Sequence, residues 1–141
     1  MHEEHVKAMV NQCSVARLLG IEIYEVGKGF AKGRLTLRAE LLNMFGMPHG
    51  GVLFTFADQV GAACGNTLGR QAVALDSTIH FVKPATGEKE LLAEAVLTHT
   101  SKRIGRLDVK VTTPDGDAVA LMHQLFFIKD KEHEVPPSEH I

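Results

Sequence analysis

Between Glu40 and Arg70 the chain carries a single Asp, Glu, Lys or Arg, and that residue is Asp58. Within this stretch, residues 50–68 (GGVLFTFADQVGAACGNTL) form the longest run of apolar and small residues, which is too long for one strand. The run is apolar on almost every side, and a helix of that kind is buried against other elements. Several glycines, His49 and Asp58 interrupt the longer stretch of residues 41–69, so that stretch does not suit a membrane span of about 20 apolar residues. We therefore predict a central helix over residues 50–68.

The segments on both sides of this helix have the composition and alternation of strands. Residues 30–38, for example, place apolar and small side chains on one face and Lys, Arg and Thr on the other. Sequences typical of turns separate the strands, including the hairpin signal TPDGD at 113–117. The predicted strands cover residues 21–26, 30–38, 72–82, 91–100, 104–113 and 118–128.

Short turns between the strands imply antiparallel pairing. Residues 2–19 have apolar side chains at three- and four-residue spacing, which predicts a further helix that ends at Gly20. The chain is therefore expected to be an α+β protein, with an antiparallel sheet of about six strands around one long helix and an extra N-terminal helix. Its 141 residues suit a single domain, placed at 1–128, with a polar tail at 129–141.

Composition narrows the classes of function. Lys plus Arg number 15 and Asp plus Glu number 17, so the net charge of −2 provides no basic excess to neutralise a nucleic-acid backbone. The first ten residues lack the basic and apolar regions of a signal peptide. Cys13 and Cys64 have no zinc-type spacing and are expected to be buried free thiols. We expect a cytoplasmic protein with no nucleic-acid or membrane partner.

Asp58 is the first candidate for chemistry. It stands alone in a helix that is expected to be buried, and burying an ionised carboxylate without partners is costly. One explanation is structural, with Asp58 capping a loop or pairing with Arg70 or another arginine. The other explanation is functional, because an isolated carboxylate can act as a general base or a nucleophile.

The sequence His49-Gly50-Gly51 at the start of the helix is the second candidate. Two glycines let the chain turn tightly and bring backbone N–H groups close to a ligand. The first N–H groups of a helix have no intrahelical partner, so they can stabilise a developing oxyanion. A simple loop-to-helix turn would also account for the two glycines.

The spacing of these two candidates sets a constraint. Gly50 and Asp58 are eight residues apart, which is about 12 Å along one helix. Both cannot contact one carbonyl, so a reaction that uses both needs two copies of the helix across a two-fold interface. The spacing predicts a catalytic homodimer.

Two segments carry a resemblance to a known family. The segment NMFGMPHGGVLFTFADQVG (43–61), with Asn43, His49 and Asp58, and the segment LDSTIHFVKPA (75–85) resemble the hot-dog-fold acyl-CoA thioesterases of the phenylacetate-pathway type. The resemblance covers roughly residues 20–128. It implies a hot-dog fold and hydrolysis of an aryl or short- or medium-chain acyl-CoA, with no cofactor besides the coenzyme A of the substrate. The expected assembly is a homodimer or a homodimer that pairs again into a dimer of dimers, and the sequence does not decide between the two.

The resemblance assigns roles to the matching residues. Asp58 matches the catalytic carboxylate, and the Gly50 amide matches the oxyanion donor that the partner subunit contributes. Asn43 and His49 match positions that line the same site. Some members carry Ser where this chain has Ala74, so the group that orients the attacking water is not predicted.

Basic residues near the turn at 101–103 match the region where related enzymes hold the phosphates of coenzyme A. A solvated hairpin tip is the alternative, although local positive charge is enough to bind phosphate. The candidate contacts to coenzyme A are Gly51, Lys83, Lys102, Arg103 and Arg106.

Two other functions remain open on this fold. One is an acyl-thioester hydratase or dehydratase that uses His49 as an acid or base, and the other is a non-catalytic acyl-CoA-binding protein. For the acyl group itself, Met47, Phe54 and Phe56 predict an apolar, partly aromatic pocket, which is compatible with aryl and with medium-chain acyl groups.

The other histidines are interpreted as structural. His2 and His5 have no third ligand in the sequence, so no metal site is predicted. His123 belongs to the alternating apolar face of residues 119–127, and we expect an interior or interface position for it.

Overall fold

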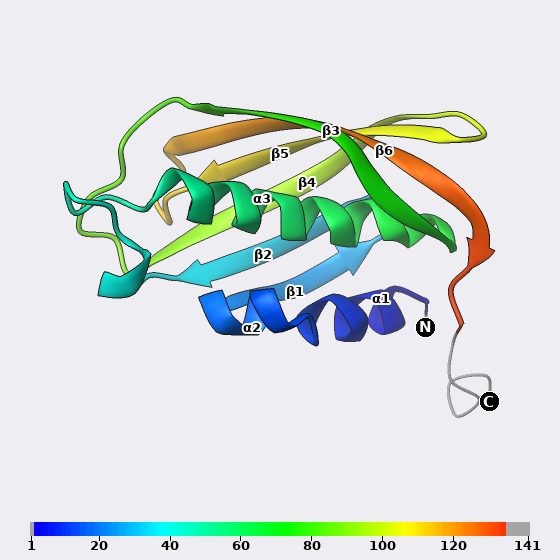
Figure 1. The fold of residues 1–141 in the computed structure, drawn as a ribbon, viewed down its shortest axis with the longest axis horizontal. Helices are drawn as coiled ribbons and strands as arrows, with labels where there is room; N and C mark the ends of the chain where they lie inside the picture. The colour runs from blue at the N-terminus through cyan, green and yellow to red at the C-terminus, as the bar shows by residue number, and fades with distance from the viewer. Residues whose placement is uncertain (1, 135–141) are drawn as a thin grey trace.

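The structure is a computed structural model that describes residues 2–134 (Figure 1). The helices are α1 (His2–Asn11), α2 (Ser14–Leu19) and α3 (Gly50–Gly65), with the single-turn 3-10 helices η1 (Ala39–Leu41) and η2 (Asn66–Leu68). The strands are β1 (Ile21–Gly27), β2 (Phe30–Thr36), β3 (Arg70–Phe81), β4 (Glu90–Thr100), β5 (Ile104–Thr112) and β6 (Ala118–Glu132). None of the described helices is long and apolar enough to cross a membrane.

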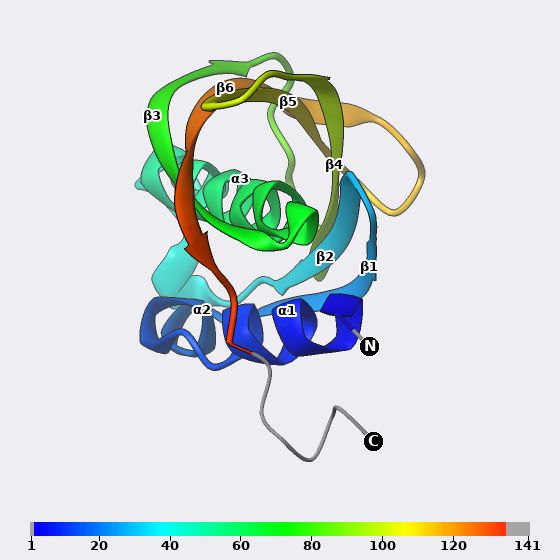
Figure 2. The ribbon, with the colours of Figure 1, turned by 90° about the vertical axis from the view of Figure 1, so that its right-hand side faces the viewer.

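The six strands form one antiparallel sheet in the order β1-β2-β4-β5-β6-β3. Figure 2 shows this sheet curving around α3, with α1 and α2 below α3 and next to β1. A sheet wrapped around one long helix is the hot-dog fold, so the predicted α+β class and the central helix are confirmed. β3 forms one edge of the sheet, and its only described strand partner is β6.

The core lies between α3 and the inner face of the sheet. Ala31 and Gly33 of β2 face α3, as the alternation of this strand predicts. A Cβ atom on Gly33 would lie 2.9 Å from Val60 Cγ2, so the close approach of α3 requires a glycine there. Cys64 is buried as predicted, and this burial raises its pKa to about 12, whereas Cys13 is only half-buried.

Gly61 and Gly65 let α3 approach β6 closely. A Cβ atom on Gly61 would lie 2.9 Å from Gln124 Oε1 and 3.3 Å from Leu107 Cδ1. We expect Gly61→Ala to lower the free energy of unfolding by about 1–3 kcal/mol, because overpacking displaces these neighbours. Urea denaturation measures the loss, and Gly65→Ala is the control, since its Cβ atom would lie at an ordinary 3.5 Å from Phe126. Equal losses in the two variants would contradict the prediction.

The predicted helix over residues 2–19 is interrupted. α1 ends at Asn11, and α2 begins at Ser14 after an extended Cys13 (φ −60°, ψ 127°). Asn11 accounts for the break, because its Nδ2 donates to Ile23 O at 2.9 Å and its Oδ1 accepts from Ile23 N–H at 2.8 Å. These two bonds fix the end of α1 to the edge strand β1. Gly20 ends α2 at φ 82°, as predicted.

The C-terminal strand is longer than predicted. β6 continues to Glu132, so residues 129–132 of the predicted tail belong to the sheet. Arg70 of β3 pairs with Glu132, and the Asp130 side chain binds Arg103. The remainder of the predicted tail from residue 135 onwards lies outside the described residues.

Candidate active site

His49 and Asn43 organise the N-terminus of α3. His49 caps the helix, with its Nδ1 accepting from Gly51 N–H at 2.9 Å. Asn43 Oδ1 accepts from Met47 N–H at 3.1 Å and closes the loop before the helix. Gly51 N–H is therefore occupied, whereas Gly50 N–H donates to no described residue.

Gly50 N–H lies beside a cavity of about 450 Å³. Asn43, Met47, Phe81 and Lys83 are among the residues that line this cavity. An unpaired amide at the positive end of the helix dipole can stabilise a negatively charged oxygen. This cavity therefore has the donor and the apolar walls that an oxyanion site requires.

The predicted acyl-pocket residues separate in the structure. Met47 lines the Gly50 cavity. Phe56 is fully buried in the core, and Phe54 packs against the core from a half-buried position. Both phenylalanines belong to α3 and neither of them lines the Gly50 cavity.

Asp58 lies two turns further along α3, half-buried beside a second cavity of about 170 Å³. Gln124 Nε2 donates to Asp58 Oδ1 at 2.7 Å and to Ser77 Oγ at 2.8 Å. The predicted alternative, an ion pair with Arg70, does not form, because the Arg70 guanidinium donates to the backbone oxygen of Lys102. Asp58 is thus held by a neutral donor and has no cation among its described partners.

Gln124 and Ser77 are site residues that the sequence did not reveal. Gln124 belongs to the inner face of β6, where the neighbouring inward side chains are Met122 and Phe126. A polar residue within an apolar face is the signal that could have identified it. Ala74 also lines the Asp58 cavity and contributes no hydroxyl, so Ser77 supplies the hydroxyl of this hydrogen-bond network.

The Gly50 and Asp58 cavities are separate within one chain. Both of them border β3, but at different positions: Ala74 lines the Asp58 cavity and Phe81 lines the Gly50 cavity. One chain therefore does not bring the amide and the carboxylate to a common point.

Lys102 and Arg103 lie in the turn between β4 and β5, as predicted. The Arg103 guanidinium binds the Asp130 carboxylate, and this hydrogen bond lowers the pKa of Asp130. Lys102 forms no ion pair with a described residue. Lys83 lines the Gly50 cavity and also pairs with Asp117 at 3.1 Å.

Residues 2–134 contain no group of three or more His, Cys, Asp or Glu that could hold a metal ion.

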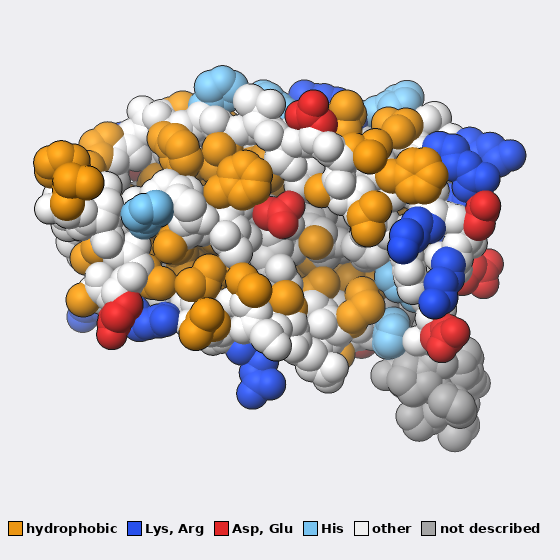
Figure 3. Space-filling view, viewed as in Figure 1, with side chains coloured by type: hydrophobic (Ala, Val, Ile, Leu, Met, Phe, Trp, Pro, Cys, Tyr) orange, Lys and Arg blue, Asp and Glu red, His pale blue; other side chains and the backbone are white. Residues whose placement is uncertain are grey.

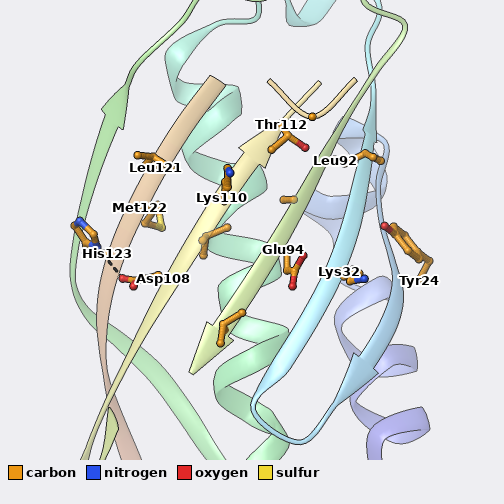
Figure 4. Close-up of a pocket in the computed structure, with 14 residues that line it drawn as sticks. Tyr24, Lys32, Leu92, Glu94, Asp108, Lys110, Thr112, Leu121, Met122 and His123 are labelled. Atoms are coloured by element: carbon orange, nitrogen blue, oxygen red, sulfur yellow. Dashed lines mark hydrogen bonds and ion pairs between the residues drawn. The ribbon is translucent and has the colours of Figure 1, made fainter. Parts of the chain in front are cut away.

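A larger cavity of about 720 Å³ lies on the outer face of the sheet, with α3 behind the strands (Figure 4). His123 is exposed on this side and bonds Asp108 at 2.7 Å, so it does not lie in the interior of the chain, and the predicted alternative, an interface position, stays a prediction. β6 is apolar on both faces, and the face opposite His123 packs against α3. The floor of this cavity consists of strands whose N–H groups pair within the sheet, so it offers no oxyanion donor like Gly50.

Arg106, a predicted contact to coenzyme A, lies within β5 and not in the turn at 101–103, and it donates to Asp108 at 3.0 Å.

Comparison with known proteins identifies the family. The family model of the thioesterase superfamily matches residues 45–120. This range includes Gly50 and Asp58, each of which lines one of the two cavities. The chain belongs to the thioesterase superfamily. Gln124 lies beyond the part that this superfamily model matches.

Individual members of the superfamily resemble the chain over most of its length. It is 35% identical over 118 residues to the acyl-coenzyme A thioesterase PaaI of Escherichia coli K12, covering 84% of each protein. The structure of the E. coli PaaI protein from the phenylacetic acid degradation operon matches with a TM-score of 0.87 at 31% identity, covering 93% of this chain and 95% of that one. A hypothetical thioesterase from Streptococcus pneumoniae TIGR4, solved with coenzyme A, matches with a TM-score of 0.75 at 26% identity, covering 80% and 88%.

Proposed function

We propose that this member of the thioesterase superfamily hydrolyses acyl-CoA thioesters at a site built by two copies of the chain. Gly50 N–H of one copy binds the thioester carbonyl oxygen, and Asp58 of the other copy drives hydrolysis. The observation that carries the proposal is that α3 presents an unpaired amide and a half-buried carboxylate to two different cavities. The similarity to the acyl-coenzyme A thioesterase PaaI of E. coli supports a thioester substrate, and the similarity to the S. pneumoniae structure solved with coenzyme A supports coenzyme A as part of it.

The edge strand β3 supports a dimer. It exposes Val73, Leu75 and Phe81, the last two at 57% each, and Figure 3 shows hydrophobic side chains gathered over α3 and β3. An exposed apolar edge strand is a template for pairing with another chain. Antiparallel pairing of two β3 strands, centred between residues 77 and 78, would bring Ala74 of one copy opposite Phe81 of the other. Each Asp58 cavity would then meet the Gly50 cavity of the other copy.

Two routes of hydrolysis fit this arrangement. Asp58 either takes a proton from the water that attacks the carbonyl carbon, or attacks that carbon itself to form an anhydride that water then cleaves. In both routes the C–S bond breaks, coenzyme A leaves as the thiol, and the acyl group leaves as a carboxylic acid. Gly50 N–H and the helix dipole stabilise the negative oxygen that forms on the way.

Basic side chains would hold the phosphates of coenzyme A. Lys102 is the first candidate because its ammonium group forms no ion pair with a described residue. Arg103 is the second, and its pair with Asp130 is exposed, so exchanging that carboxylate for a phosphate costs little. Lys83, which lines the Gly50 cavity, is the third. The acyl group would occupy the Gly50 cavity beside Met47 and Phe81.

A panel of acyl-CoA substrates tests the function. We expect thiol release with kcat/KM of about 10⁴ M⁻¹s⁻¹ or more for at least one substrate, with benzoyl-, phenylacetyl- and hexanoyl-CoA preferred over palmitoyl-CoA. Hydration of an enoyl-CoA without thiol release would instead establish a hydratase. Tight binding by calorimetry without any turnover would establish an acyl-CoA-binding protein.

A further inference from the structure

We propose that Gln124 is a positioning residue that holds the Asp58 carboxylate by its Oδ1 and leaves Oδ2 for the reacting groups. The inference rests on the proposed function of Asp58. Gln124 bonds Asp58 at 2.7 Å and lies outside the segment that the superfamily model matches.

The burial of Gln124 requires a reason. Its side chain is only 2% exposed, between the inward Met122 and Phe126. Burying an amide without hydrogen bonds is costly, so an apolar residue would be the simpler occupant of this position. The Gln124 amino group instead uses both of its hydrogens, one to Asp58 and one to Ser77.

The orientation of the Gln124 amide is fixed by its partners. An ionised carboxylate only accepts hydrogen bonds, so the group that faces Asp58 must be the amino group. The amide oxygen lies on the side of Gly61, where a Cβ atom would come within 2.9 Å of it. Gly61, one turn after Asp58 on α3, thus leaves room for the Gln124 amide that bonds the Asp58 carboxylate.

Ser77 completes the arrangement from the neighbouring strand. Ser77 and Gln124 face each other in the register of β3 and β6, and the serine oxygen accepts the second amide hydrogen at 2.8 Å. The amide is therefore anchored at both hydrogens and cannot rotate without losing one bond. A neutral donor held in this way orients the carboxylate and leaves its negative charge in place. An arginine in the same position would also orient the carboxylate, but it would neutralise that charge.

The surroundings isolate this interaction from other titrating groups. Among the described residues, Asp58 is the only titratable side chain that lines its cavity. None of the other titratable residues on β3 and β6 lines this cavity: Arg70, Asp76, His80, His123, Lys129, Asp130, Lys131 and Glu132. On β5, Arg106 and Asp108 bond His123 at the outer face of the sheet. Within one chain, Asp58 is therefore the titratable group that a new carboxyl at position 124 would contact.

The pH profile of Gln124→Glu tests the proposal. Two carboxyl groups at hydrogen-bond distance share one proton, because both cannot ionise at low cost. We expect the acid limb of the kcat/KM profile, measured between pH 5 and 9.5, to move to higher pH by about one unit or more. If the acid limb of the variant stays at the wild-type pH, the side chain at position 124 does not contact the Asp58 carboxylate, and the proposal is overturned.

Gln124→Met separates positioning from folding. Methionine fills a similar volume without the amide, and we expect kcat to fall by about 10–100-fold with KM changed by less than about threefold. The matched control is Gln59→Met, since Gln59 follows Asp58 on α3 but donates to Val10 O at 2.8 Å. It should lower the melting temperature without lowering kcat. Equal kcat values in the two variants would refute a positioning role. Full activity of Asp58→Asn would instead refute the proposed function itself.

Discussion

Replacing Asp58 by asparagine should lower kcat for acyl-CoA hydrolysis by about 10²–10⁴-fold, the usual contribution of a general base. Asparagine has the same shape, and its carbonyl oxygen can still accept from Gln124 Nε2, which lies 2.7 Å from Oδ1. The substitution therefore removes the charge and leaves the hydrogen bond in place. Steady-state kinetics with the best substrate of the panel measure the loss, and a thermal melt verifies that the fold is retained.

The KM of this variant should change by less than about threefold, because the binding of coenzyme A and the acyl group is assigned to other residues. None of Lys83, Lys102 and Arg103 lines the Asp58 cavity. Gln59→Met, one residue further along α3, is again the matched control and should retain wild-type kcat. If Asp58→Asn keeps activity within a few-fold of the wild type, Asp58 is not the group that drives hydrolysis.

The central helix could be predicted because its signal is local. Residues 50–65 form α3 and residues 66–68 form η2, so the predicted range of 50–68 has the observed ends. Turn sequences and alternation likewise placed all six strands within a few residues of their observed bounds. The break after α1 depends on Asn11 bonding Ile23. That contact joins two elements, and no pattern within residues 2–19 contains it.

The candidate site also contains residues that local sequence predicts and residues that depend on contacts between elements. Asp58 and Gly50 stand out in the sequence because one is an isolated charge and the other starts a helix. The His49 ring decides which of the two glycine N–H groups stays unpaired. Its Nδ1 accepts a hydrogen bond from Gly51 N–H, so Gly50 N–H is left without a partner among the described residues. Gln124 is a polar residue within one apolar face of β6, but this signal did not single it out, because β6 is apolar on both faces and alternation does not say which face is inward.

Replacing Gly50 by proline should lower kcat by about 10²–10³-fold, because it removes one oxyanion donor. Proline is tolerated at the first position of a helix, and His49 has the extended conformation (φ −64°, ψ 137°) that suits a residue before proline. Gly50→Ala is the matched control. It also adds a Cβ atom, which would lie 3.2 Å from the Phe81 ring, but it keeps the N–H. A similar loss in both variants would attribute the effect to crowding by the side chain and not to the amide.

Combining the two active-site variants tests whether the site is shared between copies. A heterodimer of one Gly50→Pro chain and one Asp58→Asn chain, isolated with two affinity tags, has one site with both groups intact. It should recover about half of the wild-type kcat per dimer, although each parent homodimer is nearly inactive. The reciprocal heterodimer pairs a wild-type chain with the double variant Gly50→Pro/Asp58→Asn. Each of its sites then lacks one group, so it should be nearly inactive. If Gly50 and Asp58 of the same chain act together, the two results are reversed: the first heterodimer is inactive and the second keeps half of the activity.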